Sequence, residues 1–521
     1  MDVGSGNKNI GFERLLAVAI LLATASFYLH AQETVFDTPV TIRMNNVKVS
    51  SVLKSITRKT GFEFTYDTDL VLPDSIVNIS AIDSPVREVL DDMFRQRELS
   101  YTTIGKHIII YLEPGRNTNV IEEEGREPVY LVSGWVIEKE SGQPLPYATL
   151  GIYGKGKGTV SNFDGGFSLK VNAADLADSL RISYLGFKNM IIPVNTIIGS
   201  NYRIELERDY VPIPEVIIRS REPIELIRNI RLNIPANYGT TPSMLSAFYR
   251  ESISRKSKLQ EYSEAIINIY KSPYARSFQT DQVSLFKSRK IVNTEITDTL
   301  IVKLKAGLSS CLALDGIRNT FDFIAEENLG DYNYRMVDII SFDEEAAFVI
   351  EFSQKDYITD IPLFNGLIYI NTDNYGVHSA EFEINPKHID KIDNQFVPQS
   401  AKDYTVKVRK VKYKVDYRYL NGRYYLNHVR GDIELFARKK RSLFGSPYYI
   451  FFELATTSID TVNVSRFNRN ETFPTRNIFS EIITGYDPDF WGTDNFVKPE
   501  DDIQEAINRI NAKIGKFEQE F

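Results

Sequence analysis

One stretch of the chain, residues 130–206, alternates apolar and polar residues in short runs that turn signals interrupt every few residues. Two of these signals, residues 143–146 and 164–166, contain the proline and glycine residues that tight turns require. No helical period longer than one turn fits between them, so only short antiparallel strands remain for this stretch. We therefore predict a small β-sandwich over residues 129–210.

Several segments of this stretch resemble the carboxypeptidase regulatory-like domain. They are VSGWV at 132–136, GQPLPYA at 142–148, GTVS at 158–161, DGGFSL at 164–169 and SYLGF at 183–187. Members of this family are transthyretin-like sandwiches at the N-terminus of many TonB-dependent outer-membrane receptors, and they accompany carboxypeptidases without being the catalytic part. The resemblance implies an accessory module that serves binding or folding.

The N-terminal region has the pattern of an export signal. Lys8 and Arg14 precede an apolar run over residues 15–29, and the small residue Ala31 follows. This order is typical of a secretory signal peptide, which we place at residues 1–31. A membrane anchor is the alternative, but the run is short for a bilayer. The only cysteine, Cys311, lies in an apolar run far from the expected cleavage site, so we predict a buried thiol and no lipid attachment.

Length and charge limit the possible functions. A chain of 521 residues has room for about three domains. Its formal net charge of -8 argues against a nucleic-acid partner, which would need a concentrated basic face.

Residues 35–113 are expected to form an internally repeated α+β domain. Apolar residues at helical spacing begin at Val49 and again at Val86, and an alternating strand pattern follows each helix. The two halves align with a shift of 37 positions, which brings Phe64 onto Tyr101. The unit resembles the secretin and TonB short N-terminal domain, which touches a regulatory partner in signalling receptors and lines a ring in secretins. We interpret His107 as an ordinary hairpin residue, because no second metal ligand accompanies it.

The C-terminal half is predicted to be rich in antiparallel strands. Short helices are expected at 223–232 and 242–256, and a longer one at 503–521. The clearest strands, 413–419 and 424–436, flank the turn pair Asn421 and Gly422. The resulting domains are a linker at 114–128, a linker with a helix at 211–240, a β-rich domain at 241–465 and a tail at 466–521. Residues 364–373 resemble the sheet of periplasmic lipoprotein and lipid carriers, and a curved half-barrel is one form that such a domain can take. The half is too short for the plug and barrel of a TonB-dependent receptor.

Three motifs imitate known sites. His378 and Glu381 have the spacing of a zinc carboxypeptidase pair, with His428 as the nearest third ligand, but residues three apart on a strand face opposite sides, so we favour an ordinary strand. Residues 151–157 imitate a phosphate loop, although Gly158 stands where Ser or Thr would bind magnesium, so we predict a hairpin turn. The basic cluster at 438–441 is interpreted as a solvated turn, with lipid phosphates as the alternative.

These observations predict a multidomain α+β and all-β protein: a small repeated βαβ domain, a β-sandwich, and a β-rich antiparallel domain with a helical C-terminal tail. We expect no catalytic, metal or cofactor-binding residues. The leading hypothesis is a non-enzymatic, exported accessory protein at the periplasmic face of the outer membrane, which binds outer-membrane and periplasmic proteins of a transport, signalling or assembly complex. The alternative is a periplasmic carrier or receptor subunit that binds a lipid, glycan or lipoprotein in its C-terminal sheet.

Overall fold

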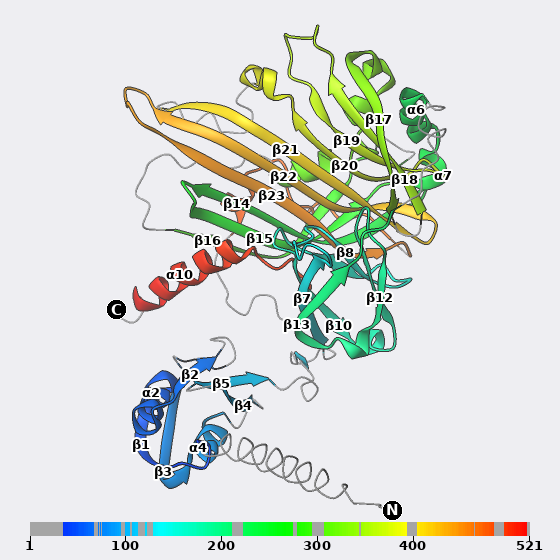
Figure 1. Cartoon of the computed structure of the whole chain (residues 1–521). Coiled ribbons are helices and arrows are strands. Elements are labelled where there is room, and N and C mark those ends of the chain that lie inside the picture. Colours follow the sequence, from blue (N-terminus) through cyan, green and yellow to red (C-terminus); the bar gives the residue numbers. More distant parts are fainter. Residues whose placement is uncertain are drawn as a thin grey trace, which may run out of the picture. The chain divides into compact units, whose positions relative to one another are not determined.

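The computed structural model of the chain describes residues 35–66, 71, 73, 75–94, 99–104, 107–112, 120–121, 129–210, 222–274, 279–293, 307–342, 345–392, 404–462, 464–483 and 494–517. The chain divides into two compact units, Met1–Thr118 and Asn119–Phe521 (Figure 1). The predicted signal peptide and the first part of the linker at 211–240 lie outside the described residues. Of the linker at 114–128, only β6 (Val120–Ile121) is described.

In its described residues, the first unit contains two copies of a strand, a helix and a strand, followed by one further strand. Its elements are β1 (Pro39–Lys48), α2 (Val49–Thr60), β2 (Glu63–Tyr66), β3 (Ile76–Pro85), α4 (Val86–Met93), β4 (Leu99–Ile104) and β5 (His107–Leu112). β3 and α4 begin 37 residues after β1 and α2, which confirms the predicted repeat. β1 pairs with β3, and β5 lies between β2 and β4. His107 begins β5, where it pairs with Ile104 and Glu63.

The two helices of this unit form where the sequence pattern placed them. Their apolar faces, which include Val52 and Leu53 of α2 and Leu90 of α4, are buried in one core. α2 ends at Gly61, whose positive φ of 73° lets its N–H donate to the carbonyl of Thr57 at 2.8 Å.

The predicted sandwich begins the second unit and has two four-stranded sheets. Its elements are β6, β7 (Val129–Glu138), β8 (Thr149–Ile152), β9 (Gly158–Val160), β10 (Gly166–Asn172), η1 (Ala173–Asp175), β11 (Ser179–Ser183), β12 (Met190–Pro193), η2 (Val194–Thr196) and β13 (Gly199–Leu206). β10, β7 and β13 form one sheet, to which β6 adds, and β12, β11, β8 and β9 form the other. Inward-facing residues of both sheets, such as Val136, Leu150 and Leu169, make the core.

Ten antiparallel strands form one large sheet in the order β16-β15-β14-β23-β22-β21-β20-β19-β18-β17. They are β14 (Ser243–Arg255), β15 (Lys258–Lys271), β16 (Gln282–Val292), β17 (Tyr332–Phe342), β18 (Glu345–Gln354), β19 (Phe364–Asn371), β20 (Val377–Ile384), β21 (Tyr404–Leu420), β22 (Arg423–Lys439) and β23 (Gly445–Asp460). The predicted turn between β21 and β22 is present, with positive φ at Asn421 and Gly422. The predicted fold class is therefore confirmed.

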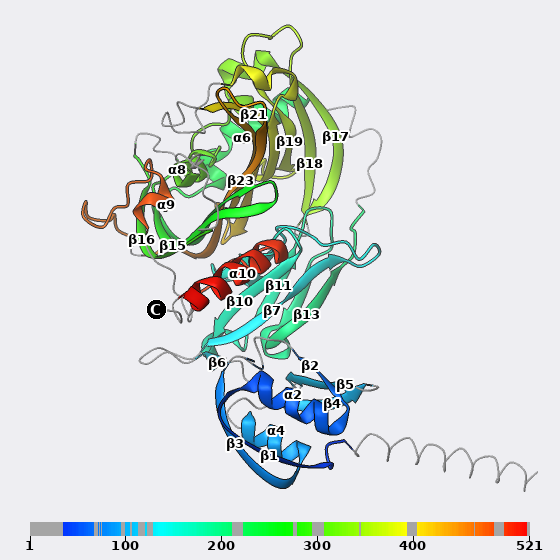
Figure 2. The same cartoon turned by 90° about the vertical axis from the view of Figure 1, so that its left-hand side faces the viewer.

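Both faces of this curved sheet are covered (Figure 2). The inner face packs against α6 (Pro223–Leu232), α7 (Ile234–Asn237), α8 (Gly307–Ala313), η3 (Asp322–Ile324), η4 (Glu326–Asp331) and α9 (Phe479–Ile482), and the short helix η5 (Pro386–Lys391) follows β20. The outer face packs against the sandwich and against α10 (Asp501–Phe517). Ile503 and Ile507 of α10 are buried in one apolar cluster with Tyr262 and Phe451 of the sheet. The inner core includes Cys311, which is the buried thiol that the sequence predicted.

One predicted helix is wrong. Residues 242–256 were expected to be helical, but they form β14, a central strand of the large sheet. Leu245 and Tyr249 point to the inner core, and Phe248 points to the outer one. Because the strand is buried on both faces, apolar residues occupy both sets of alternating positions and imitate a helical pattern. The predicted helices at 223–232 and in the C-terminal tail are present as α6 and α10. None of the helices among the described residues is long and apolar enough to cross a bilayer.

Candidate functional site

Seven strands of the large sheet each place one charged residue in the same cross-strand row on the outer face. In order from β16 to β20, the row consists of Arg289, Glu264, Arg250, Glu453, Arg430, Lys414 and Glu381. We call these seven residues the charged row. The sign alternates over the first five positions, so most cross-strand neighbours attract each other.

The centre of the charged row is removed from water. Arg250 and Glu453 are fully buried, and the Nε of Arg250 donates to the Oε2 of Glu453 at 2.5 Å. Glu500, just before α10, completes the pairing: its Oε1 lies 3.1 Å from Nη2 of Arg250 and 2.9 Å from Nη1 of Arg430. A buried charge that loses its partner is strongly destabilising. The C-terminal segment, by which we mean residues 494–517, therefore supplies a carboxylate that neutralises buried arginines of the sheet.

His428 connects this row to the sandwich. Its Nε2 lies 2.7 Å from the Oε1 of Glu453 and its Nδ1 lies 3.2 Å from the Oδ2 of Asp416. Burial opposes the imidazolium form, but the hydrogen bonds to these two carboxylates outweigh burial and raise the pKa of His428. Burial likewise opposes the ionised form of Glu453, but Arg250 and His428 hold the pKa of that carboxyl well below its usual range. The ring of Tyr147, from the sandwich, stacks on His428 with 4.7 Å between centroids.

Further hydrogen bonds join the sandwich and the C-terminal segment to the sheet. Asn427 donates to the hydroxyl of Thr149 at 3.1 Å, and the amide of Ile459 donates to the carbonyl of Gly156 at 3.1 Å. The sandwich is also joined to the C-terminal segment, because the side chain of Asn162 donates to the carbonyl of Pro499 at 2.9 Å. The sandwich, sheet and C-terminal segment therefore form one packed body, in agreement with the single compact unit Asn119–Phe521.

Two clefts open beside the charged row where the sandwich meets the sheet. The smaller has a volume of about 260 Å³ and is lined by residues that include Tyr184, Tyr369, His378 and Asp416. The larger has a volume of about 430 Å³ and is lined by residues that include Phe163, Lys412, Glu383, Arg430 and Asp432. Tyr147, Glu381 and Lys414 line both clefts. We call the two together the junction cleft, and its aromatic rings and charges of both signs suit the recognition of a polar partner.

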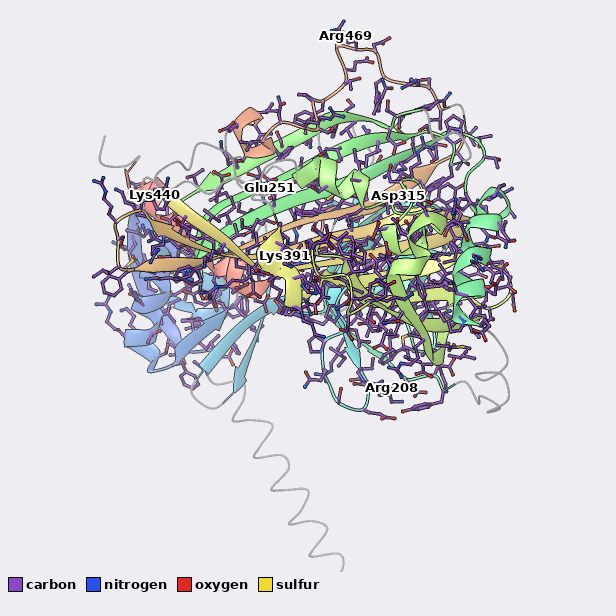
Figure 3. The ribbon with its side chains drawn as sticks, turned by 90° about the horizontal axis from the view of Figure 1, so that it is seen from above. Arg208, Glu251, Asp315, Lys391, Lys440 and Arg469 are labelled. Carbon is purple, nitrogen blue, oxygen red and sulfur yellow. The ribbon has the colours of Figure 1, made fainter. Side chains whose placement is uncertain are left out.

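The inner face contains two buried carboxylates, Glu251 and Asp315 (Figure 3). Asp315 follows α8 and accepts hydrogen bonds from Lys271 at 2.7 Å, Tyr274 at 2.9 Å and Tyr417 at 3.0 Å. It therefore fastens the end of α8 to the sheet. Glu251 accepts a hydrogen bond from the hydroxyl of Tyr249 at 2.6 Å, and burial raises its pKa to about 8.

Of the three sequence motifs that imitate known sites, neither the zinc-site motif nor the phosphate-loop motif forms such a site in the described residues. His378 is buried, and burial lowers its pKa to about 3, whereas Glu381 reaches solvent and pairs with Lys414. His428 is held by Asp416 and Glu453, and the described part of the chain contains no group of three or more His, Cys, Asp or Glu residues arranged to hold a metal. Residues 151–157 form the β8–β9 hairpin, as predicted. The basic cluster at 438–441 lies at the end of β22.

Comparisons with known proteins support one part of the predicted resemblance. Residues 132–218 match the family described as the CarboxypepD_reg-like domain, which confirms the carboxypeptidase regulatory-like assignment of the sandwich. No curated protein matches the chain. The secretin and TonB short N-terminal assignment of the first unit stays a prediction.

Solved structures are similar to about half of the chain. A domain provisionally named as an outer membrane lipoprotein-sorting protein, from Vibrio parahaemolyticus, is 11% identical, with a TM-score of 0.19 over 48% of this chain and 97% of that one. A DUF1329 family protein from Desulfovibrio piger is 13% identical, with a TM-score of 0.18 over 47% and 96%. A LolA superfamily protein from Nitrosomonas europaea is 11% identical, with a TM-score of 0.15 over 47% and 96%. Likeness at these scores does not establish a shared fold.

The charged row was not found from the sequence. One signal was present, because Arg250, Arg430 and Glu453 each directly follow an aromatic or apolar residue in the middle of a strand. Charged residues in the middle of buried strands need partners on neighbouring strands. Which strands are neighbours depends on pairings between residues as much as 203 positions apart, and these are not visible in the sequence.

Proposed function

We propose that this chain is a non-enzymatic, exported accessory protein of a Gram-negative cell envelope, which works at the periplasmic face of the outer membrane by binding other proteins. The sandwich and the sheet together would offer the binding surface, and the first unit would contact a periplasmic partner, as its resemblance to the secretin and TonB short N-terminal domain implies. The partner complex would serve transport, signalling or assembly.

The junction cleft is the observation that carries this proposal. Near the cleft, buried charged residues of the sheet pair with each other, as Arg250 does with Glu453, and these pairs are not available to a partner. The cleft itself exposes Phe163 beside Lys412 and Glu383. Aromatic residues and arginine are enriched at the centres of protein interfaces, whereas a polar rim keeps such surfaces soluble. The cleft has this combination.

A second observation favours a surface role over a carrier role for the sheet. The apolar inner face, where a carrier would hold an acyl chain, packs against side chains of α6, α8 and η3 in one continuous core. Phe323 of η3 stacks on Phe352 of the sheet with 3.9 Å between centroids. The chain itself thus supplies apolar contacts to this face.

A photo-reactive amino acid at Phe163 would test the proposal in intact envelopes. Phe163 is 57% exposed and lines the larger cleft. Tyr153, on the same sandwich, is 56% exposed and serves as the matched control. We expect a discrete cross-linked envelope protein from position 163 that is absent from position 153. Identical products from both positions, or none from either, would contradict the proposal.

The second candidate function is a receptor subunit that binds a glycan in the same cleft. The rings of Tyr147 and Phe163 offer flat apolar surfaces, and Lys412, Glu383 and Asp432 offer hydrogen-bonding groups within a volume of about 430 Å³. Native mass spectrometry of the full chain isolated from envelopes distinguishes the two. A bound mass that disappears in Phe163→Ser would favour the receptor, whereas a chain without bound mass would favour protein docking.

A further inference from the structure

The hairpin of β22 and β23 extends beyond the strands on either side of it. β21 pairs with β22 as far as Lys439, and β14 pairs with β23 as far as Tyr448. Residues 440–444 lie past both limits, and we call them the hairpin tip. Figure 1 shows the hairpin projecting from the sheet, and Figure 3 shows Lys440 at its far end.

The hairpin tip exposes two adjacent large apolar side chains. Leu443 is 88% exposed and Phe444 is 84% exposed, the highest values among the large hydrophobic residues that the structure describes. Single exposed apolar residues are common on protein surfaces. Two adjacent ones at a projecting turn leave a larger apolar area in contact with water, which is typical of a surface that binds a partner.

Hydrogen bonds give the hairpin tip a definite shape. The amide of Ser442 donates to the carbonyl of Lys439 at 2.9 Å, and the amide of Phe444 donates to the hydroxyl of Ser442 at 3.2 Å. The same hydroxyl donates to the carbonyl of Phe444 at 3.0 Å. Arg441 has a positive φ of 69°, which turns the chain here. The turn thus satisfies polar backbone groups internally and leaves Leu443 and Phe444 pointing outward.

Positive charge surrounds these two apolar side chains. The four residues before Ser442, namely Arg438, Lys439, Lys440 and Arg441, are all exposed cations, and none forms an ion pair with another residue in the described ranges. Lys256 and Lys258 are exposed at the neighbouring β14–β15 turn, where the amide of Lys256 donates to the carbonyl of Pro447. The formal charge of the whole chain is -8, so this local concentration has the sign opposite to that of the molecule.

We propose that the hairpin tip binds the surface of an anionic phospholipid bilayer. Leu443 and Phe444 would enter the boundary between head groups and acyl chains, while Lys439, Lys440 and Arg441 contact lipid phosphates. A projecting turn cannot enclose a ligand, but it can enter a fluid surface that deforms around it. A bilayer therefore fits the convex shape, the apolar pair and the charge together. This inference is independent of the junction cleft and adds a membrane contact to the proposed docking function.

Vesicle flotation of the full chain tests this inference. We expect binding to vesicles of phosphatidylethanolamine and phosphatidylglycerol, weak binding to phosphatidylcholine, and a decrease with added salt. In Phe444→Trp, the added tryptophan should shift its emission to shorter wavelength with the anionic vesicles, and brominated lipids should quench it. Equal binding to neutral and anionic vesicles, or an unshifted emission, would overturn the proposal.

Two sets of variants separate the apolar and the charged contributions. Leu443→Ser with Phe444→Ser should lower binding about tenfold or more, and removal of Lys439, Lys440 or Arg441 as Gln should lower it about fivefold for each cation. Leu232→Ser, at a residue 75% exposed elsewhere, and Lys387→Gln, at an exposed lysine, are the controls and should bind like the parent chain. If the tip variants bind vesicles normally but lose a cross-linked envelope protein, the surface recognises a protein and the membrane assignment is wrong.

Discussion

Among single residues, the charged row is the feature that places opposite charges on neighbouring strands of the large sheet. Arg250 lies opposite Glu264 on one side and Glu453 on the other. A shift of one residue in either pairing would turn buried charges away from their partners and toward the apolar inner core. Buried ion pairs add little net stability compared with apolar residues, but separating them is costly. We therefore infer that the row specifies register.

Replacing Glu453 by Gln should remove the charge that Arg250 and His428 share. We expect a loss of about 3–5 kcal/mol in the free energy of unfolding, because a buried guanidinium loses its main partner. Urea unfolding measures the loss. The matched control is Asp356→Asn, which breaks the exposed pair with Lys387 and should change stability by less than about 1 kcal/mol. If the two substitutions lower the free energy of unfolding equally, the buried pairs of the charged row are no more important for stability than an exposed ion pair.

Glu251 predicts a pH dependence that the surface carboxylates do not share. Burial raises its pKa from an ordinary 4.5 to about 8, so the folded chain holds this proton where the unfolded chain has released it. The contribution to stability is complete below about pH 4.5 and is lost as the pH rises toward about 8. The ionisable groups that interact with it are Tyr249, Glu261 and Cys311.

The variant Glu251→Gln should flatten this dependence. Thermal unfolding between pH 5 and pH 8 should show a smaller decrease in Tm for the variant than for the parent chain, because the amide can still accept the hydrogen bond from Tyr249 without a charge. Glu351→Gln, at a half-buried residue that pairs with Arg335, is the control and should keep the parent slope. Parallel curves for parent and Glu251→Gln would contradict the assignment.

At the scale of elements, the β8–β9 hairpin fastens the sandwich to the sheet. Gly156 at its turn accepts a hydrogen bond from Arg418 of β21 at 3.0 Å, in addition to the one from Ile459 of β23. A Cβ atom at this position would lie only 2.3 Å from the carbonyl oxygen of Ile459. Of the glycines that imitate a phosphate loop, Gly156 is therefore explained by close packing of backbones, and Gly154 by its positive φ of 70°.

Gly156→Ala should separate this hairpin from the sheet. We expect a loss of about 1–3 kcal/mol in the free energy of unfolding, since backbone atoms on both sides must shift. Gly330→Ala is the control, because a Cβ atom there meets nothing within 4 Å, and it should be nearly neutral. Chemical denaturation of both variants measures the difference, and equal stability would argue against a tight contact at Gly156.

Local patterns predicted most elements, and pairings between distant segments explain the exceptions. α2 and α4 and the β21–β22 hairpin follow from apolar periodicity and from the Asn421-Gly422 turn, which are properties of adjacent residues. β14 differs from the predicted helix, because its burial on both faces depends on the strands that pair with it and cannot be read from its own residues. The junction cleft was equally invisible, since Tyr147 of the sandwich and Lys414 of the sheet line it together only after the sandwich packs on the sheet.

Seen over the whole second unit, the sandwich packs against the large sheet within one compact body. Asn495 and Lys170 exchange two hydrogen bonds, and the Nζ of Lys498 lies 4.7 Å from the ring centroid of Trp135. The sandwich is thus held by the sheet and by the segment before α10. A domain fastened in this way is expected to unfold together with its support.

Destabilising the sandwich should therefore also destabilise the sheet. Leu169→Ala removes a fully buried side chain from the sandwich core and should cost about 2–5 kcal/mol. In a Trp491→Phe background, Trp135 fluorescence follows the sandwich, while hydrogen exchange of β22 and β23 follows the sheet. We expect both signals to shift to lower denaturant by the same amount, and Tyr153→Ala, at an exposed residue of the sandwich, to shift neither. If fluorescence of Leu169→Ala changes before exchange protection in the strands is lost, the sandwich unfolds alone, and the charged row and C-terminal segment do not couple the two.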